Sequence, residues 1–354
     1  MPAVPVQPLS DSRSDLTHLN NLLRGVSRSF YLTLRILPTA IRQQIGLAYL
    51  LARAADTLAD STVLPPSQRL AALQLFRQQL GGCVSAIALA EIESQLLGKL
   101  NNQHEAQLLQ QLPQLFALLE QQRAEERALI EKVVTTLTSG MVFDLNTFPM
   151  EESGEVRALQ TENELDHYTY MVAGCVGEFW TAISIAHLPS LRRWESEHYS
   201  QLGIRFGKGL QLTNILRDLP RDLRLGRCYL PESLLQKHQL TVAMLLERHN
   251  SAAAKAMLRE GIQMALHHFV AAMEYVTAIP RHCIRLRLAA LWPLLIGVGT
   301  LEKLAGTSDW LDVNHVAKVK RQWVYRMMVL SLLCVGSNSL IRGWVDRLAR
   351  RASI

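Results

Sequence analysis

Apolar side chains recur along most of this 354-residue chain at the spacing of amphipathic helices. No stretch shows the sustained apolar and polar alternation of half-buried strands, so sheets are not expected. Leu, Ala, Gln and Arg, which favour helices, are abundant. No linker is long enough to separate two domains. The pattern therefore predicts an all-α fold in one helical domain.

Proline and glycine divide this pattern into segments. Breaks are expected at Pro38, Pro65-Pro66 and Gly81-Gly82, and segments 148–157 and 223–231 are expected to be loops. The predicted helices cover about 16–27, 39–60, 67–80, 90–100, 105–148 with a break near Pro113, 162–187, 189–219, 233–239, 241–277, 281–304 and 313–351. We expect three regions: a flexible N-terminus (1–15), the helical domain (16–312) and a basic C-terminal helix (313–354).

The C-terminal helix combines charge with apolar residues. Eight of its side chains are Lys or Arg, and Asp346 is its one acid. It is either a packed helix with a solvated basic face or an interfacial helix in contact with anionic lipid. The other apolar run, 288–301, contains Pro293 and two glycines, so we expect a buried core helix there.

Composition narrows the class of protein only a little. The net charge of +6 suits an anionic partner without choosing among phosphate, membrane and nucleic acid. The five cysteines show no CxxC spacing, so neither a disulfide framework nor a zinc site is expected. This cysteine usage favours a reduced, cytoplasmic location, with peripheral contact on the inner membrane face as an option. The N-terminus lacks the charged and apolar regions of a signal peptide. No nucleic-acid partner is expected, because basic and aromatic residues do not interleave in a patch.

A first group of polar residues lies in the predicted helix 39–60. Tyr49, Arg53, Asp56 and Asp60 are spaced by four, three and four residues, so they share one helix face. Two carboxylates in the apolar surround of GLAYLLARAA would repel each other unless a cation lay between them. Alone, this DxxxD pattern is equally compatible with two solvated aspartates at a helix end.

A second group follows about 160 residues later. Gln211, Asn214, Asp218 and Asp222 are spaced by three, four and four residues, and Arg217 precedes the first aspartate. Two such faces opposing each other across a bundle could hold magnesium ions, which would bind a diphosphate. The arginine of each motif would add charge-assisted contacts to the phosphates.

Several motifs in a fixed order carry a family resemblance. They are SRSF (Ser27–Phe30), Tyr49–Asp60, Tyr168–Gly177, and Gln211–Asp222 followed by GRCYLP (Gly226–Pro231). Together, over about 22–304, they resemble the squalene and phytoene synthase family, magnesium-dependent enzymes that join two prenyl diphosphates head to head. The first acid motif is similar to the squalene branch, and GRCYLP is similar to the phytoene and dehydrosqualene branch.

The resemblance implies a role for individual residues. Magnesium would be bound by Asp56, Asp60, Asn214, Asp218 and Asp222, and these aspartates together with Tyr168 would be the catalytic set. The substrates would contact Ser27, Arg28, Phe30, Tyr49, Arg53, Gln211 and Arg217. NADPH would contact Arg28, Arg53, Arg217, Lys318 and Lys320. The prenyl cavity would be shaped by Phe30, Tyr49, Ala173, Gly174 and Gly177.

The resemblance also implies an isoprenoid-synthase-type bundle around a central cavity and a reaction. Two farnesyl diphosphates would condense to a cyclopropyl (presqualene) diphosphate, which NADPH would reduce to squalene. The alternatives are a dehydrosqualene or phytoene synthase without a reductant, and a non-catalytic helical scaffold. Three departures from the family pattern concern the metal site: Ala59 and Arg221 stand where acids are usual, and Pro220 could kink the helix that carries Asp222.

Overall fold

The computed structural model describes residues 19, 21–26, 30–61, 63–82, 84–96, 100, 102–148, 154–314 and 316–353. Helices dominate the described residues, which confirms the all-α prediction. The elements are α2 (Phe30–Ile36), α3 (Thr39–Ala59), α4 (Pro66–Leu80), α5 (Ala86–Leu96), α6 (Gln103–Gln110), α7 (Leu112–Glu120), α8 (Ala124–Thr147), β1 (Arg157–Ala158), α9 (Glu162–Thr169), η1 (Tyr170–Gly174), α10 (Cys175–His187), η2 (Pro189–Leu191), α11 (Ser196–Arg224), β2 (Arg227–Cys228), α12 (Glu232–Lys237), α13 (Val242–Leu245), η3 (Arg248–Ser251), α14 (Lys255–Ala278), α15 (Ile284–Ala305), α16 (Arg321–Cys334) and α17 (Asn338–Ala352).

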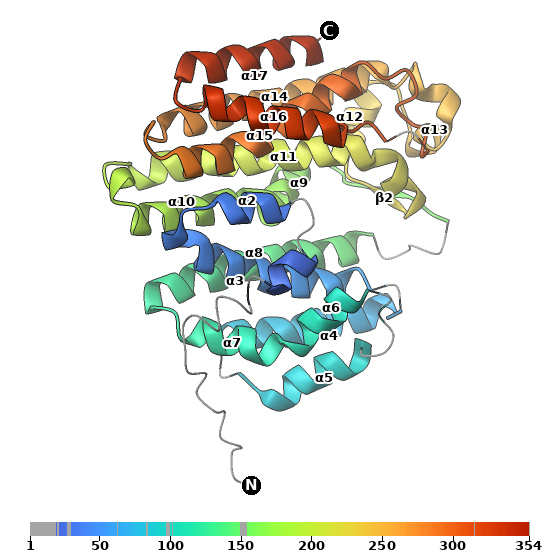
Figure 1. The fold of residues 1–354 in the computed structure, drawn as a ribbon. Helices are drawn as coiled ribbons and strands as arrows, with labels where there is room; N and C mark the ends of the chain where they lie inside the picture. The colour runs from blue at the N-terminus through green and yellow to red at the C-terminus, as the bar shows by residue number, and fades with distance from the viewer. Residues whose placement is uncertain are drawn as a thin grey trace, which may run out of the picture.

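The helices stack in layers along the long axis of the molecule (Figure 1). α4 to α7 lie at the lower end of the molecule in this view, and α3 and α8 pack together above them. α11 packs against α10, α14 and α15 in the other half. One cluster of buried apolar side chains extends through both halves, from Leu19 to Ala352. The bundle therefore places α3 and α8 opposite α11.

α11 continues past the proline that was expected to end or kink it. We predicted a helix end at Leu219, but the helix extends through Pro220 to Arg224. Proline has no N–H, so the carbonyl of Leu216 loses its usual partner four residues on. The indole N–H of Trp310 donates to that carbonyl at 2.8 Å instead. This long-range bond satisfies the freed acceptor, and Asp222 stays on the helix.

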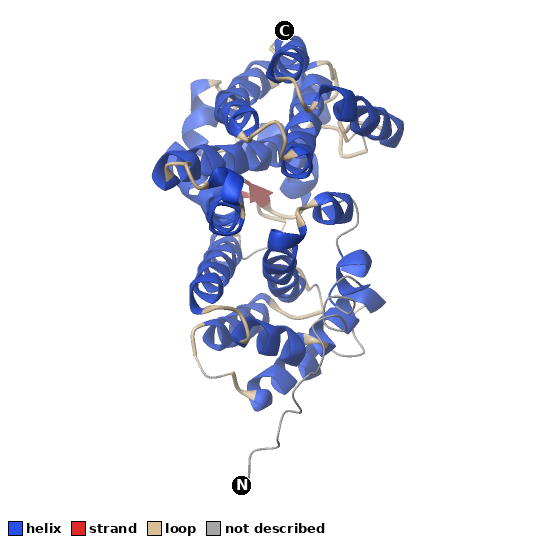
Figure 2. Cartoon of the chain, turned by 60° about the vertical axis from the view of Figure 1, so that its left-hand side comes forward, coloured by secondary structure: helices blue, strands red, loops and turns tan. Residues whose placement is uncertain are grey.

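A short strand, β2, follows α11, where we expected only a loop. Gly226 turns the chain with a φ of +80°, a conformation that suits glycine. β2 then pairs with β1, with Arg157 opposite Arg227 and Ala158 opposite Cys228 (Figure 2). Strands of two residues carry no periodicity that a sequence could reveal. The pairing fixes the segment that carries Arg227 and Tyr229.

Several helix boundaries differ from the prediction. The segment 105–148 forms three helices, because a further break occurs at 121–123, between α7 and α8, where neither proline nor glycine stands. The C-terminal segment was predicted as one helix over 313–351 but forms α16 and α17. Ser337 caps α17, since its hydroxyl accepts from the N–H of Leu340 at 3.4 Å.

α15 is the apolar helix that the sequence placed in the core. By length and composition it could cross a membrane, with a mean hydropathy of 1.5, but 78% of that window is buried inside the protein. Its buried residues include Pro293's neighbours Trp292 and Leu294. The structure thus confirms a core helix over 288–301.

α10 and α11 approach each other more closely than ordinary side chains would permit. A Cβ atom at Gly177 would overlap the carbonyl oxygen of Gly203, and one at Gly207 would overlap that of Ala173. The obstructing atoms belong to the backbone, so they could not move aside without displacing a helix. Glycine at these positions therefore sets the distance between the two helices.

Gly177→Ala is expected to lower the free energy of unfolding by about 2–3 kcal/mol, because the added methyl must push α10 away from α11. The matched control is Gly343→Ala in α17, where a Cβ would meet nothing within 4 Å. That change should be neutral or stabilise by up to about 1 kcal/mol. Urea unfolding of both variants measures the difference, and equal stabilities would contradict the close-packing argument.

Candidate active site

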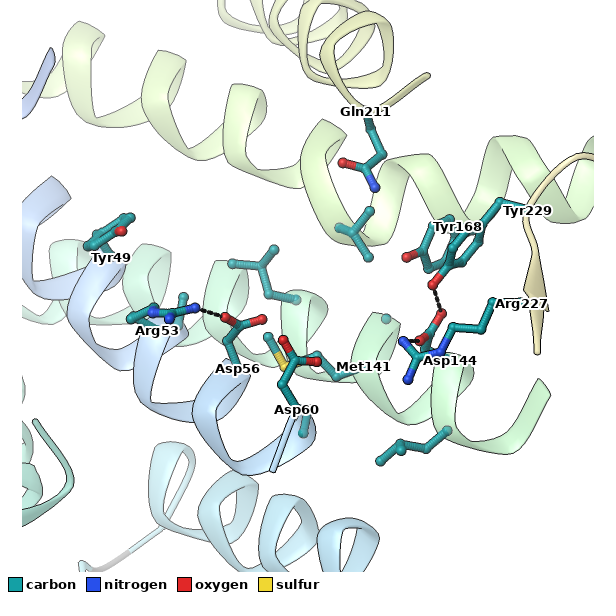
Figure 3. Close-up of a pocket in the computed structure, with 16 residues that line it drawn as sticks. Tyr49, Arg53, Asp56, Asp60, Met141, Asp144, Tyr168, Gln211, Arg227 and Tyr229 are labelled. Carbon is teal, nitrogen blue, oxygen red and sulfur yellow. Dashed lines mark hydrogen bonds and ion pairs between the residues drawn. The ribbon is translucent and has the colours of Figure 1, made fainter. Parts of the chain in front are cut away.

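A cavity of about 450 Å³ opens between α3, α8 and α11. Both aspartates of the first acid motif, Asp56 and Asp60, line it from α3 (Figure 3). Asp56 lies in the last turn of α3, and Asp60 is its C-cap residue. The helix dipole places partial negative charge at this end, so the helix itself gives two carboxylates here no electrostatic support. A bound cation would supply that support.

A second, apolar cavity of about 530 Å³ adjoins the first. Four residues line both: Tyr49, Leu137, Val172 and Gln211. The walls of this apolar cavity come mainly from α3, α10, α11 and α15, and its aromatic members are Tyr49, Phe179, Trp180, Phe206 and Tyr275. An acidic opening is thus joined to a hollow with mostly apolar walls, and its acidic residues from the two predicted motifs are those of the first motif alone.

Arg53 is already engaged by carboxylates. Its guanidinium forms an ion pair with Asp56 one turn along α3 and another with Glu105 of α6 at 2.6 Å. Burial and the nearby charge of Asp60 nevertheless raise the pKa of Asp56 to about 6. The arginine therefore acts as a stand-in cation that only partly offsets the crowding of negative charge.

The second acid motif is only partly turned toward the cavities. Gln211 lines both of them, and Asn214 lines the apolar one. Asp218 and Asp222 are among the lining residues of neither. Asp218 instead pairs with Arg217 at 2.5 Å.

Asp222, like Asp218, is partly buried, and its carboxyl is crowded by charge. Burial and the charge of Asp218 raise the pKa of Asp222 to about 7, while Arg227 opposes this rise. Arg227 itself lines the acidic cavity. Arg227 therefore links the charge of Asp222 to the charges that line the cavity.

A cluster around Asp144 was not predicted from the sequence. Asp144, on α8, lines the acidic cavity and forms an ion pair with Arg227 at 2.7 Å. It also accepts a hydrogen bond from the hydroxyl of Tyr229 at 2.7 Å (Figure 3). Asp144 stands alone in its helix, with no second acid at helical spacing. The GRCYLP motif contained both partners and was the one signal that could have pointed to them.

Tyr168, the predicted catalytic tyrosine, belongs to this cluster. Its ring stacks on that of Tyr229 with centroids 4.8 Å apart, and Phe143 packs beside it at 5.9 Å. Burial, followed by the charge of Asp144, raises the pKa of Tyr168 well above its usual range. Tyr168 is therefore a neutral phenol at physiological pH, able to donate a hydrogen bond toward the cavity it lines.

The remaining predicted residues do not all meet at this site. Ser27 and Arg28 lie outside the described residues, as does the side chain of Phe30. Of the predicted wall residues, Tyr49, Ala173 and Gly177 line the apolar cavity. Lys318 and Lys320 are exposed in the non-helical stretch before α16 and line neither cavity.

The acidic cavity fits a magnesium ion that is shared with a diphosphate. Within the described ranges, no three His, Cys, Asp or Glu side chains gather closely enough to hold a metal by themselves. Magnesium bound with phosphates needs only one or two protein carboxylates, because phosphate oxygens and water complete its shell. Asp56 and Asp60 can supply these ligands.

Comparisons with known proteins agree with this geometry. The family model "Squalene/phytoene synthase" matches residues 23–323. The squalene synthase of Eremothecium gossypii is 22% identical over 99% of this chain and 76% of its own length. The presqualene diphosphate synthase of Rhodopseudomonas palustris is 29% identical over 74% of this chain and 78% of its own.

A solved structure shares the fold. The complex of TcSQS with the ligand BPH1237 superposes with a TM-score of 0.75 at 20% identity, covering 96% of this chain and 98% of that one. The family match spans most of the chain and includes both acid motifs. The chain belongs to the squalene/phytoene synthase family of prenyltransferase-type enzymes.

Proposed function

We propose that this protein joins two farnesyl diphosphates head to head through presqualene diphosphate and reduces the product to squalene with NADPH. The observation that carries the proposal is the acidic cavity that opens into an apolar one, with four residues shared between them. A prenyl diphosphate has the same division into a charged head and an apolar tail. Its diphosphate would lie near Asp56 and Asp60, and its chain would enter the apolar cavity.

Charge balance at the head group supports this placement. Bound magnesium would neutralise the leaving diphosphate. Asp56 and Asp60 would hold the ion from α3, and Asn214, Asp218 and Asp222 are the proposed ligands from α11. The pairing of Arg53 with Asp56 and of Arg217 with Asp218 means that both arginines could exchange a carboxylate for a phosphate when substrate binds.

The walls of the apolar cavity suit a carbocation. Water would trap an allylic cation, and a largely apolar lining excludes it. The rings of Phe206, Trp180 and Tyr275 can stabilise positive charge through their faces. The hydroxyls of Tyr275 and Thr181 are hydrogen-bonded to each other at 3.0 Å, so that phenol is not a free nucleophile in the cavity.

Tyr168 has a narrower role in this proposal than that of a base. Its raised pKa disfavours a phenolate, so it would donate a hydrogen bond as a neutral phenol and keep its proton. Tyr229 orients it by stacking, and Asp144 holds Tyr229. Together these three residues would fix a hydrogen-bond donor beside the head group.

A second candidate function omits the reduction. The chain is similar to a presqualene diphosphate synthase at 29% identity, and Lys318 and Lys320, proposed for NADPH, line neither cavity. The reaction would then stop at presqualene diphosphate, or proceed without a reductant to dehydrosqualene. The two candidates share the acidic cavity and differ in the use of NADPH.

The deciding experiment incubates the full chain with farnesyl diphosphate and magnesium, with and without NADPH, and identifies the products by mass spectrometry. We expect squalene only when NADPH is present, and presqualene diphosphate when it is absent. Geranylgeranyl diphosphate is run in parallel to test chain length. A product mixture that does not respond to NADPH would overturn the reductive proposal and favour the second candidate.

A further inference from the structure

α16 presents an apolar face to the outside of the molecule. Its outward residues include Tyr325, Val329, Leu332 and Leu333, spaced by four, three and one, so they form one stripe along the helix. Their exposed fractions are 61%, 63%, 57% and 77%. The solvent side of a packed helix normally carries polar residues, so a continuous apolar stripe there requires an explanation.

The opposite side of α16 is fixed to the core. Met327 and Ser331 are buried, and the Ser331 hydroxyl accepts a hydrogen bond from the indole N–H of Trp292 on α15 at 2.9 Å. A Cβ at Gly299 would meet the ring of Trp323 at 2.9 Å, which shows how closely the two helices pack. The helix therefore cannot rotate its apolar stripe inward without breaking this packing.

Exposed cations lie in the same C-terminal segment as the apolar stripe. They are Lys318, Lys320, Arg321 and Arg326 before and within α16, and Arg347 and Arg351 on α17, whereas Arg342, Asp346 and Arg350 of α17 line a groove against α14. Arg351 pairs with Glu302 at 3.3 Å. Lys318, Lys320, Arg321, Arg326, Arg347 and Arg350 form no ion pair with any residue that the structure describes. Their charge remains available to an external anion.

We propose that α16 and these cations form a docking surface for an anionic lipid bilayer, with α16 lying in the plane of the interface. Apolar side chains flanked by Lys and Arg are the combination that interfacial helices use. A second copy of this chain fits less well, because a symmetric contact would bring two sets of cations together. The inference does not depend on the proposed function.

The docking surface lies one helix away from the apolar cavity. α15 separates them: Ala289, Ala290 and Pro293 line the cavity, whereas Trp292 of the same helix contacts α16. Figure 1 shows α16 and α17 in the half of the molecule opposite α5. Docking through α16 would therefore leave both α5 and the described walls of the cavity unobstructed.

Vesicle sedimentation of the full chain tests the proposal. Binding to phosphatidylcholine vesicles that contain phosphatidylglycerol should exceed binding to pure phosphatidylcholine by about tenfold or more, and it should weaken as salt is added. The double change Leu332→Glu and Leu333→Glu should reduce binding by about tenfold or more. Arg326→Gln and Arg347→Gln should each reduce it by about fivefold.

Controls separate docking from misfolding and from self-association. Ile87→Glu in α5 makes the same kind of change once, at a residue that is 82% exposed, and it should leave vesicle binding unchanged. All variants should keep the parent melting temperature. Equal binding of the parent and the Leu332/Leu333 variant would overturn the proposal. A dimer that the same variant dissociates, without vesicle binding by the parent, would assign the face to a second copy instead.

Discussion

Asp56→Asn is expected to reduce turnover of farnesyl diphosphate by about 10³-fold or more, because it removes a carboxylate that should hold magnesium on the leaving diphosphate. The amide keeps the shape of the side chain but cannot offer a negative oxygen to a magnesium ion. Asp56 lines the acidic cavity at the C-terminal end of α3, where Asp60 alone would remain. Single-turnover kinetics with saturating magnesium measures the effect on the chemical step.

Stability should distinguish this loss from unfolding. Asp56 repels Asp60, so its neutralisation removes an unfavourable interaction in the folded protein. Arg53 loses one partner and keeps Glu105 at 2.6 Å. The net change in the free energy of unfolding should stay within about 1 kcal/mol.

A binding measurement adds a readout that does not require catalysis. Calorimetry with magnesium and inorganic pyrophosphate should show weaker binding in Asp56→Asn than in the parent. Asp309→Asn serves as the control, since Asp309 is half exposed and pairs with Arg248 on the surface. Turnover retained in Asp56→Asn would reject the metal assignment, whereas a parent without any turnover would favour a non-catalytic scaffold.

The two acid motifs show what helical spacing can predict and what it cannot. Asp56 and Asp60 were placed on one face from their separation alone, and both line the acidic cavity. The same argument placed Asp218 and Asp222 on a second face, but neither lines a described cavity. Spacing fixes which residues share a face, whereas the rotation of the helix depends on packing with α10, α14 and α15.

The contacts that could not be predicted from the sequence are those between residues far apart in the chain. Asp144 and Arg227 are 83 residues apart, and β2 has to pair with β1 before their side chains can meet. Pro220 misled the helix prediction for a similar reason. The donor that rescues the Leu216 carbonyl is Trp310, 94 residues away. Helix prediction from local sequence treats a proline as a break, because it contains no information about a hydrogen-bond donor so distant in the chain.

Asp144→Asn is expected to lower the free energy of unfolding by about 3 kcal/mol, because it removes the carboxylate charge that pairs with Arg227 in a largely buried place. The side chains of Asp144 and Arg227 are only 14% and 15% exposed. The same carboxylate accepts the hydroxyl of Tyr229, so the change also weakens the anchor of the Tyr168 stack. Denaturant unfolding of the purified variant measures the loss.

Two further variants divide this effect into its parts. Tyr229→Phe removes only the hydroxyl bond and should cost about 1 kcal/mol. Asp144→Asn combined with Arg227→Gln removes both charges, so the double variant should lose less stability than the sum of the single ones. The surface control is Asp166→Asn, whose carboxylate pairs with Lys208 at 2.6 Å but is 61% exposed. It should cost less than about 1 kcal/mol.

The activity of Asp144→Asn tests whether the cluster positions Tyr168 or merely stabilises the fold. A looser tyrosine stack should lower kcat by about tenfold or more while KM changes little, because a hydrogen-bond donor held in the wrong place slows chemistry rather than binding. Tyr229→Phe should lower kcat in the same direction by a smaller factor. The contrary outcome has two parts: Tyr229→Phe leaves kcat unchanged, and Asp144→Asn changes both kcat and KM. That outcome would show that Asp144 acts through Arg227 and the charge of the cavity instead.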